Sequence, residues 1–536
     1  MSKLVNLDAM IRREDLEVEP DEDYYTGEGG IPVSDLMRGR IHYGLLRKPG
    51  FQRVTNDWDI DNVVTFIRSF RDGHLIPALI LWRSHNGYNF VIDGAHRLSS
   101  LIAWVNDDYG DRELSRNFFN HRIPASQEKN AQECRERIAA EVGTYRDLSI
   151  APTDEPIDRQ RVRWASNIGQ ALPAQWIRGD AEMAETSFLT INQRAVQISG
   201  PEKYMILGRK KPHVIASRAL VRSATGHKYW SRFPEENRNK IEHRAKQIYN
   251  AMFEPEDADL AKTIEMPVAG HPYSANALRV SLQLVSFANQ VRTSRDLKEF
   301  ADDADGTETL KHLDRLYNVV RHISGSSRAT LALHPAVYFW GHTGIHNPSA
   351  VLASINFFSD LIERKQLVAF SLVRARFEEF IVQHGSIAKH VMSKLGGWEK
   401  SVPGVMEMYR VIFEGLSDGK DTQEVEQELI SNRKFAGLAE KLTLESAPNS
   451  QISRETKRAV RRRELLKAAP RCPICYARMP SSAFSDDHIQ RRQDGGRGNE
   501  ENVQLTHPYC NTGLKEAHHT KGIPLPDRPD FVSVTG

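Results

Sequence analysis

The chain has 536 residues, 40% hydrophobic and 26% charged, a composition that excludes a largely disordered protein. At roughly 150 residues per domain, this length predicts about three or four domains. Lys and Arg number 72 and Asp and Glu number 70, so the net charge is only +2, but its distribution is uneven. Residues 14–28 hold eight acids and no base, and residues 451–471 hold eight Lys or Arg against two Glu.

No stretch of the sequence predicts a membrane span or a secretory signal. The longest apolar run, Leu75–Trp82, is far shorter than the ~20 residues that a span requires. The first residues lack a basic segment followed by an apolar one. Three of the four cysteines fall within residues 472–510, which is typical of a metal site in a reducing compartment. We therefore expect a cytoplasmic protein with no membrane partner.

Residues 34–200, which follow an acidic N-terminal segment (1–33), are expected to form an α/β domain. Apolar spacing predicts a helix over 62–70. The apolar run 75–82, a His-Asn-Gly turn and the stretch 88–93 predict a hairpin of buried strands, and a helix is expected over 97–106. The chain has no GxGxxG or GxxxxGK(S/T) phosphate loop, so nothing supports an ordinary Rossmann or P-loop domain.

The middle of the chain, residues 201–445, is expected to be mainly helical. Apolar residues recur at helical spacing over 310–323 and 370–381, and such stripes indicate core-forming faces without a ligand. A basic linker and helix (446–470) then leads into a last domain, residues 471–536. The fold class predicted is multidomain α+β.

Two pairs of metal-ligand residues lie near the C-terminus. Cys472 and Cys475 enclose two residues, and so do His507 and Cys510. Each pair can place two ligands on one ion, and together they form a Cys3His set suited to structural zinc. Two unrelated surface thiol pairs are the alternative.

The residues between and after these pairs form a second pattern, which includes Asp487-His488, Gly495-Gly496, Asn502, Asn511 and Lys515. In this order they resemble the HNH endonuclease family, which has a ββα-metal fold with the order CxxC, Asp-His, Gly-Gly, NxxL, CxxC, His or Asn, then Lys. This sequence departs from the family in having His507 for the usual third cysteine. Asn511 stands where many members have His, an alternative that the family also uses.

Hydrolysis of a phosphodiester needs an activated water and a cation that neutralises the phosphate and the leaving oxygen. Histidine is the side chain best suited to accept a proton from water near neutral pH, and His488 is the candidate. The resemblance implies that His488 is the general base, that Asp487 and Asn511 hold Mg2+ or Mn2+, and that Asn502 braces the loop that orients His488. Lys515 is expected to contact a phosphate or to be a solvent-exposed lysine. A structural zinc finger with a dead active site is the alternative.

The basic stretch before the zinc ligands is expected to bind DNA phosphates, with a sequence-independent affinity that falls with salt. The candidate residues are Arg458, Arg461 and Arg462. The alternative is a linker that packs on an acidic surface of the same chain.

The N-terminal region contains Gln52-Arg53 and, about forty residues later, Asp93-Gly94-Ala95-His96-Arg97. With Ile76-Pro77 and the element from Phe188 to Gln193, these residues resemble the ParB-like superfamily, including its DGQQR- and DGHHR-type domains. Some of those domains are fused to HNH-type nucleases in anti-phage restriction systems. Ala95 departs from the Gln or His common at that position.

A nucleotide- or phosphate-binding site is expected here, formed by Gln52, Arg53, Asp93, Gly94, His96 and Arg97. A strand ends at Asp93-Gly94 and a helix follows, so free N–H groups and two basic side chains can face one anion. An NTP or a DNA phosphate would satisfy that arrangement. The alternative is an Asp-Gly turn with Arg97 paired to a neighbouring carboxylate.

The leading hypothesis is a metal-dependent DNA endonuclease of the HNH type, controlled by a ParB-like domain that senses a nucleotide or modified or foreign DNA. Its role would be anti-phage restriction, an expectation that rests on analogy with the fused relatives. Double-stranded DNA is the expected partner, and a second copy of the chain and a defence-system protein are further candidates. The alternatives are a non-catalytic DNA-binding regulator and an NTP hydrolase with a subordinate nuclease.

Overall fold

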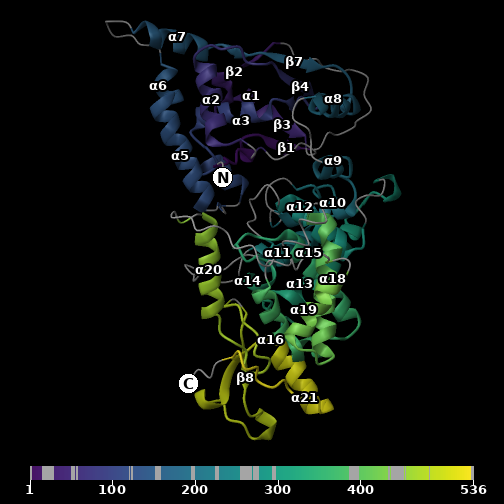
Figure 1. Ribbon diagram of the computed structural model, residues 1–536. Coiled ribbons are helices and arrows are strands. Elements are labelled where there is room, and N and C mark those ends of the chain that lie inside the picture. Colours follow the sequence, from purple (N-terminus) through teal and green to yellow (C-terminus); the bar gives the residue numbers. More distant parts are fainter. Residues whose placement is uncertain are drawn as a thin grey trace. The chain divides into compact units, whose positions relative to one another are not determined.

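The computed structural model forms two compact units, residues 1–210 with 225–232 and residues 211–224 with 233–536 (Figure 1). The residues that it describes are 3–14, 29–49, 55, 58–119, 121, 123, 125–150, 158–194, 200–221, 223, 228–253, 268–269, 277–291, 297–384, 398–432, 435, 452, 454–481 and 483–532. The acidic stretch 15–28 and the predicted site residues Gln52 and Arg53 lie outside them. The finer division into five segments stays a prediction.

The first unit contains a small mixed sheet with the strand order β1-β3-β5-β4-β7. Strands β4 and β5 pair antiparallel, and the other neighbours are parallel. A separate antiparallel pair is formed by β2 and β6. The strand bounds are β1 Arg12–Glu14, β2 Ile31–Pro32, β3 Leu46–Pro49, β4 Leu79–Arg83, β5 Asn89–Asp93, β6 Ala171–Leu172 and β7 Ala174–Ile177.

The predicted hairpin is confirmed as β4 and β5, but its first strand begins four residues later than expected. Leu75 is 97% exposed and precedes the strand. Pro77 has no N–H to donate to a neighbouring strand, and its carbonyl accepts a hydrogen bond from the Arg97 guanidinium. The apolar run is therefore divided into an exposed lead and a buried strand.

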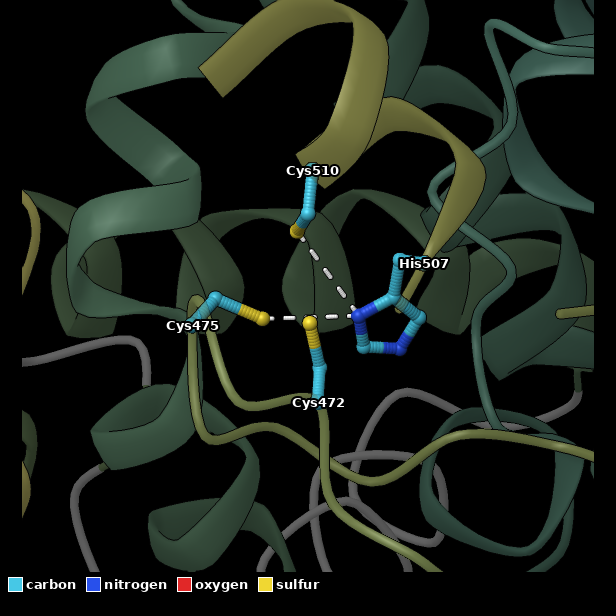
Figure 2. A group of neighbouring side chains, drawn as sticks. All are labelled: Cys472, Cys475, His507 and Cys510. Carbon is cyan, nitrogen blue, oxygen red and sulfur yellow. Dashed lines mark hydrogen bonds between the residues drawn. The ribbon is translucent and has the colours of Figure 1, made fainter. Parts of the chain in front are cut away.

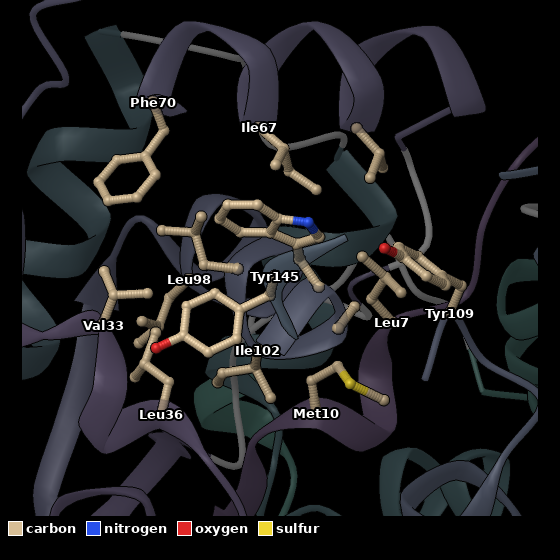
Figure 3. Packing of buried hydrophobic residues seen from close by; sticks show 14 of the residues in the cluster. Leu7, Met10, Val33, Leu36, Ile67, Phe70, Leu98, Ile102, Tyr109 and Tyr145 are labelled. Atoms are coloured by element: carbon tan, nitrogen blue, oxygen red, sulfur yellow. The ribbon is translucent and has the colours of Figure 1, made fainter. Parts of the chain in front are cut away.

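Helices and the sheet enclose the main core of this unit (Figure 3). The predicted helix over 62–70 is confirmed as α2, which buries Ile67 and Phe70, and the predicted helix over 97–106 is α3, which buries Leu98 and Ile102. The bounds are α1 Ile41–Leu45, α2 Ile60–Arg71, α3 Ala95–Asn106, α4 Glu113–Phe118, α5 Ala125–Glu141, α6 Tyr145–Leu148, α7 Arg159–Ile168, α8 Ala181–Arg194 and α9 Gly200–Leu207, with 3-10 helices at Asp8–Met10 and Val33–Leu36.

A buried carboxylate ties three segments of the first unit together. Asp8 is 0% exposed and accepts from Arg13 Nη2 at 2.6 Å, from Lys48 Nζ at 2.9 Å and from the backbone N–H of Thr55 at 3.1 Å. Lys48 also donates to the Thr55 hydroxyl at 2.9 Å. A buried charge is tolerated when it is paired and hydrogen-bonded in this way.

The second unit is a helical body that continues into a short hairpin and a final helix. Its elements are α10 Pro212–Val221, α11 Glu235–Phe253, α12 Ala277–Ala288, a 3-10 turn at Leu297–Glu299, α13 Thr307–Ile323, α14 Pro335–Tyr338, α15 Pro348–Glu363, α16 Leu367–Gln383, α18 Trp398–Ser417, α19 Thr422–Ser431, α20 Arg454–Ala468, β8 Ser485–His488, β9 Val503–Thr506 and α21 Lys515–Lys521. None of the helices in the described ranges is long and apolar enough to span a membrane.

The predicted helical stripes of this unit are confirmed as core faces. Helix α13 buries Leu313 and Val320, and α16 buries Phe370 and Phe377. Phe377 lies 5.3 Å from Phe370 and 5.8 Å from Tyr409 of α18, measured between ring centroids. The edge-on pair of Phe377 and Tyr409 joins α16 to α18.

Replacement of Asp8 by Ala should destabilise the first unit by about 3–5 kcal/mol, because two buried cations lose their shared carboxylate. The exposed pair Lys3–Glu133 supplies the control, and Glu133→Ala should cost about 1 kcal/mol or less. Hydrogen exchange read by mass spectrometry reports the two units separately. Equal loss of protection in the two variants would contradict this role of Asp8.

Candidate metal centre and active site

The four predicted zinc ligands come together in the second unit (Figure 2). Cys472, Cys475, His507 and Cys510 are all buried, and their ligand atoms lie within 4.8 Å of one another. His507 Nδ1 is 3.4 Å from Cys475 Sγ and 3.8 Å from Cys510 Sγ. A tetrahedral ion with Zn–S bonds of about 2.3 Å and a Zn–N bond of about 2.0 Å would place ligand atoms about 3.5–3.8 Å apart. The cluster therefore fits a zinc ion.

The backbone around the first pair holds these ligands in position. The Tyr476 N–H donates to the Cys472 carbonyl at 2.8 Å, and the Cys472 N–H donates to the Ala477 carbonyl at 2.9 Å, which closes a tight knuckle. His507 Nε2 lies 3.1 Å from the Arg478 carbonyl. A proton on Nε2 would donate to that carbonyl and leave Nδ1 to face the sulfur atoms. Burial raises the pKa of Cys475 well above its ordinary value.

The knuckle is attached to helix α16 through a buried ion pair. Glu378 Oε1 accepts from Arg374 Nε at 2.8 Å and from the Tyr338 hydroxyl at 3.2 Å, and Glu378 Oε2 accepts from the Arg478 N–H at 3.0 Å. Burial alone would raise the pKa of Glu378, but Arg374, His507 and these hydrogen bonds lower it. The metal ligands are thus continuous with the helical body.

The strand β8 ends in the predicted Asp487-His488 pair. Strand β9 pairs with it antiparallel, so Asp487 faces Gln504 and His488 faces Val503. Asp487 is buried, whereas His488 is partly exposed. Adjacent residues of a strand point to opposite faces of the hairpin, so only one of the two side chains turns inward.

Asp487 is held by two side chains. Lys515 Nζ lies 2.8 and 2.9 Å from the two carboxylate oxygens, and it also donates to the His488 carbonyl. Gln504 Nε2 donates to Oδ2 at 2.9 Å. The expectation that Lys515 contacts DNA or solvent is not met, because its side chain is buried against Asp487.

Asn502 clamps the loop that follows His488. Its Oδ1 accepts from the Gln490 N–H at 2.8 Å, and its Nδ2 donates to the carbonyls of Gln490 at 3.1 Å and Arg497 at 2.7 Å. Its own carbonyl accepts from the Ile489 N–H at 2.9 Å. These bonds fix the backbone immediately after His488.

The two glycines of this loop are required by its shape. Gly495 has φ +88°, a left-handed conformation that favours glycine. A Cβ on Gly496 would lie 1.9 Å from the Gln490 carbonyl oxygen, which leaves no room for a side chain. The shape of the loop between β8 and β9 therefore depends on both residues.

Asn511 lies beside strand β8, in a π-helical turn (Cys510–Leu514) that leads into α21. Its Nδ2 donates to Ser485 Oγ at 3.0 Å and to the Asp486 carbonyl at 3.2 Å. The amide is thus oriented by the strand that carries Asp487. Carboxylate and amide oxygens are the ligands that Mg2+ and Mn2+ prefer, so the side chains of Asp487 and Asn511 fit a divalent cation by their chemistry.

The three basic candidates on α20 differ in exposure. Arg461 is exposed and Arg458 is partly exposed. Arg462 is only 6% exposed, and its Nε donates to the Ala336 carbonyl at 2.7 Å. The prediction that Arg462 binds DNA is therefore wrong for this structure, because its guanidinium is enclosed by the helical body.

The predicted N-terminal phosphate site has the local structure of the alternative. Gly94 precedes α3 with φ +91°, and a Cβ there would lie 2.5 Å from Leu79 Cδ2. Arg97 Nη2 pairs with Asp93 Oδ2 at 2.9 Å. His96 stacks on Trp58 with 5.6 Å between ring centroids. Phe188 is buried with Trp82 and Phe90, and the side chains of Asn192 and Gln193 lie outside the described residues.

Two partners of the active site were not predicted from the sequence. Gln504 contacts Asp487 across the hairpin, and Ser485 accepts from Asn511. Gln504 could have been identified from the strand register, because the ends of the hairpin determine which residue lies opposite Asp487.

Comparison with known families gives two matches. Residues 33–205 match the family model of the GmrSD restriction endonuclease N-terminal domain. Residues 472–516 match the family model of the HNH endonuclease. No curated protein and no solved structure matches the chain. The second match begins at Cys472 and includes the zinc ligands, His488 and Lys515. The chain therefore carries an N-terminal domain of the GmrSD restriction endonuclease family and a C-terminal HNH endonuclease domain.

Proposed function

We propose that the protein is a metal-dependent DNA endonuclease of the HNH type that acts in restriction of modified or foreign DNA. The observation that carries this proposal is the partly exposed His488 at the end of β8, followed by a loop that Asn502 clamps and preceded by the buried Asp487. The domain matches support a nuclease of the restriction type.

His488 serves as the general base in this proposal. It accepts a proton from a water molecule whose oxygen attacks the phosphorus, the bond from phosphorus to the leaving deoxyribose oxygen breaks, and that oxygen takes a proton from solvent. Asn502 keeps the backbone after His488 fixed, so the imidazole meets the substrate in one orientation. Preorganisation of this kind lowers the barrier because no loop has to be ordered during the reaction.

Asp487 and Asn511 would hold the catalytic Mg2+ or Mn2+, which supplies charge neutralisation at the phosphate and at the leaving oxygen. Lys515 balances the charge of Asp487 and keeps its carboxylate on the inner face of the hairpin. The Asn511 amide is turned by Ser485 and by the Asp486 carbonyl. Lys515, Gln504 and Ser485 are thus positioning residues.

Exposed and partly exposed arginine side chains of the second unit would bind the DNA backbone. Arg492 and Arg497 lie in the loop after His488, and Arg458 and Arg461 lie on α20. Phosphate contacts of this type give affinity that falls with salt and carries no sequence information. We propose these four arginines as the DNA-binding residues, in place of the candidates Arg462 and Lys515, whose side chains are buried.

The first unit is proposed to select the DNA or to sense a nucleotide. The match to a restriction endonuclease N-terminal domain supports this role. The candidate surface is the start of α3, with Asp93, Gly94, His96 and Arg97. Because Arg97 is paired with Asp93, an incoming anion would compete with that carboxylate. The family matches do not support nucleotide hydrolysis by this unit, and we do not propose it.

Replacement of His488 by Ala should reduce cleavage of a supercoiled plasmid by about 100-fold or more, because the general base is lost. DNA affinity and the folded state should stay unchanged. His519 on α21 is exposed, so His519→Ala is the matched control and should cleave normally. Cleavage by His488→Ala at the rate of the wild type would remove the proposed mechanism.

Replacement of Cys472 by Ser should release the zinc and destabilise the C-terminal domain, because structural zinc supplies folding free energy. The buried Cys134 of the first unit gives a control for the same substitution, since it lies far from the ligand set in sequence. Elemental analysis of the purified proteins should find about one zinc ion per chain in wild type and Cys134→Ser and nearly none in Cys472→Ser. Equal zinc contents in all three proteins would show that the ligand assignment is wrong.

A further inference from the structure

A small cavity lies in the helical body of the second unit, and neither the zinc ligands nor His488 line it. Its volume is about 30 Å3, and residues of α14, α16, α18 and α20 line it together with the segment around Trp340 and Asn347. A water molecule needs about 10–15 Å3 measured in this way, so the space holds a few waters or one small ion. Part of the wall is aromatic, from Tyr338, Trp340, Phe380 and Tyr409.

Arg462 brings a positive charge into this wall. Its side chain is 6% exposed, and its one hydrogen bond runs from Nε to the Ala336 carbonyl at 2.7 Å. Within the described ranges, no carboxylate lies within ion-pair distance of its guanidinium. Burial, and then the like charge of Arg478, lower the pKa of Arg462 to about 10. The group still remains a cation at neutral pH.

Three other buried arginines of the protein each have a carboxylate partner, which Arg462 lacks among the described residues. Arg13 pairs with Asp8, Arg374 pairs with Glu378, and Arg478 pairs with Glu379. A buried guanidinium without a carboxylate partner costs free energy, since no opposite charge balances it. The two terminal nitrogens of Arg462 have no acceptor among the described residues, and they belong to a side chain that lines a cavity.

A helix end adds a second positive feature at the same place. Helix α15 (Pro348–Glu363) begins at the cavity, where Asn347 and Ala350 form part of the wall. The Asn347 side chain caps the helix by accepting from the Ala350 N–H at 3.1 Å. The amino end of a helix carries a partial positive charge and attracts anions.

We propose that this cavity binds a small oxyanion, either free phosphate or the phosphate group of a small phosphate ester. The fork of guanidinium N–H groups left free on Arg462 matches two oxygens of such an anion. Aromatic walls lower the local dielectric constant and strengthen the pairing. Because α20 ends at Ala468, shortly before Cys472, the bound anion would fix the helix that leads into the zinc knuckle.

The test is thermal unfolding of the full-length protein in inorganic phosphate, against sodium chloride of the same ionic strength. The melting temperature of the wild type should rise with phosphate concentration, as expected when a ligand binds the folded state. Arg462→Gln should weaken phosphate binding by at least about tenfold. Arg463→Gln removes an exposed charge from the same helix and should respond like the wild type.

Stability measured without phosphate distinguishes an anion site from an arginine with a purely structural role. Without phosphate, Arg462→Gln should be as stable as the wild type or more stable, because an unbalanced buried charge is removed. Arg462→Lys should keep a weakened response, since the charge stays but the fork is lost. A parallel experiment with adenosine monophosphate distinguishes the two ligands. A rise in melting temperature that depends on Arg462 with both compounds indicates a phosphate ester. A rise with phosphate alone indicates the free anion.

The proposal would be overturned by a wild type that does not respond to phosphate or to adenosine monophosphate. It would also be overturned by Arg462→Gln responding as the wild type does, or by a uniform loss of stability in that variant at every phosphate concentration. These outcomes do not depend on DNA cleavage, so they leave the proposed nuclease function untouched.

Discussion

The carboxylate of Glu378 connects the helical body to the zinc knuckle, and the C-terminal part of the molecule depends on that contact. It receives Arg374 and Tyr338 from the helical side and the Arg478 N–H from the knuckle. Arg374 in turn donates to the carbonyls of Leu331 and Ala332, and the Arg478 carbonyl faces His507. A buried ion pair is weak evidence for net stability, but it tolerates few alternative partners, so it specifies which surfaces meet.

This contact explains why the HNH segment is more than an appended zinc module. The Tyr509 N–H donates to the Thr330 carbonyl at 2.9 Å, and the Thr512 hydroxyl donates to the Arg328 carbonyl at 2.8 Å. Both donors lie next to the ligand Cys510 or the candidate ligand Asn511. The turn that carries these two residues is therefore held from outside the domain as well as by the metal ligands. A helical body without catalytic motifs thus acts as the support on which the active-site turn is positioned.

The local features of the nuclease site could be predicted from the sequence, and the distant ones could not. The zinc ligands follow from short spacings and known ligand chemistry, whereas the bracing role of Asn502 follows from the resemblance to the HNH family. Glu378 precedes the first ligand by a long stretch of chain, and no spacing rule relates the two. In α20, three consecutive arginines make it difficult to tell from the sequence which face of the helix is buried. Arg462 is four residues before the buried Leu466 and so shares its face, a signal that the run of charges concealed. Lys515 was misjudged because a helix lysine is usually exposed, whereas here it neutralises Asp487.

The central claim is that a divalent cation distinct from the structural zinc drives DNA cleavage at His488. The most direct measurement is plasmid cleavage by zinc-loaded wild-type protein, titrated with Mg2+ or Mn2+, with the zinc content measured in the same samples. We expect no cleavage by the zinc-loaded protein alone and a saturable rise as the divalent cation is added. Full cleavage without added cation, or none at any concentration on unmodified and modified DNA alike, would contradict the claim.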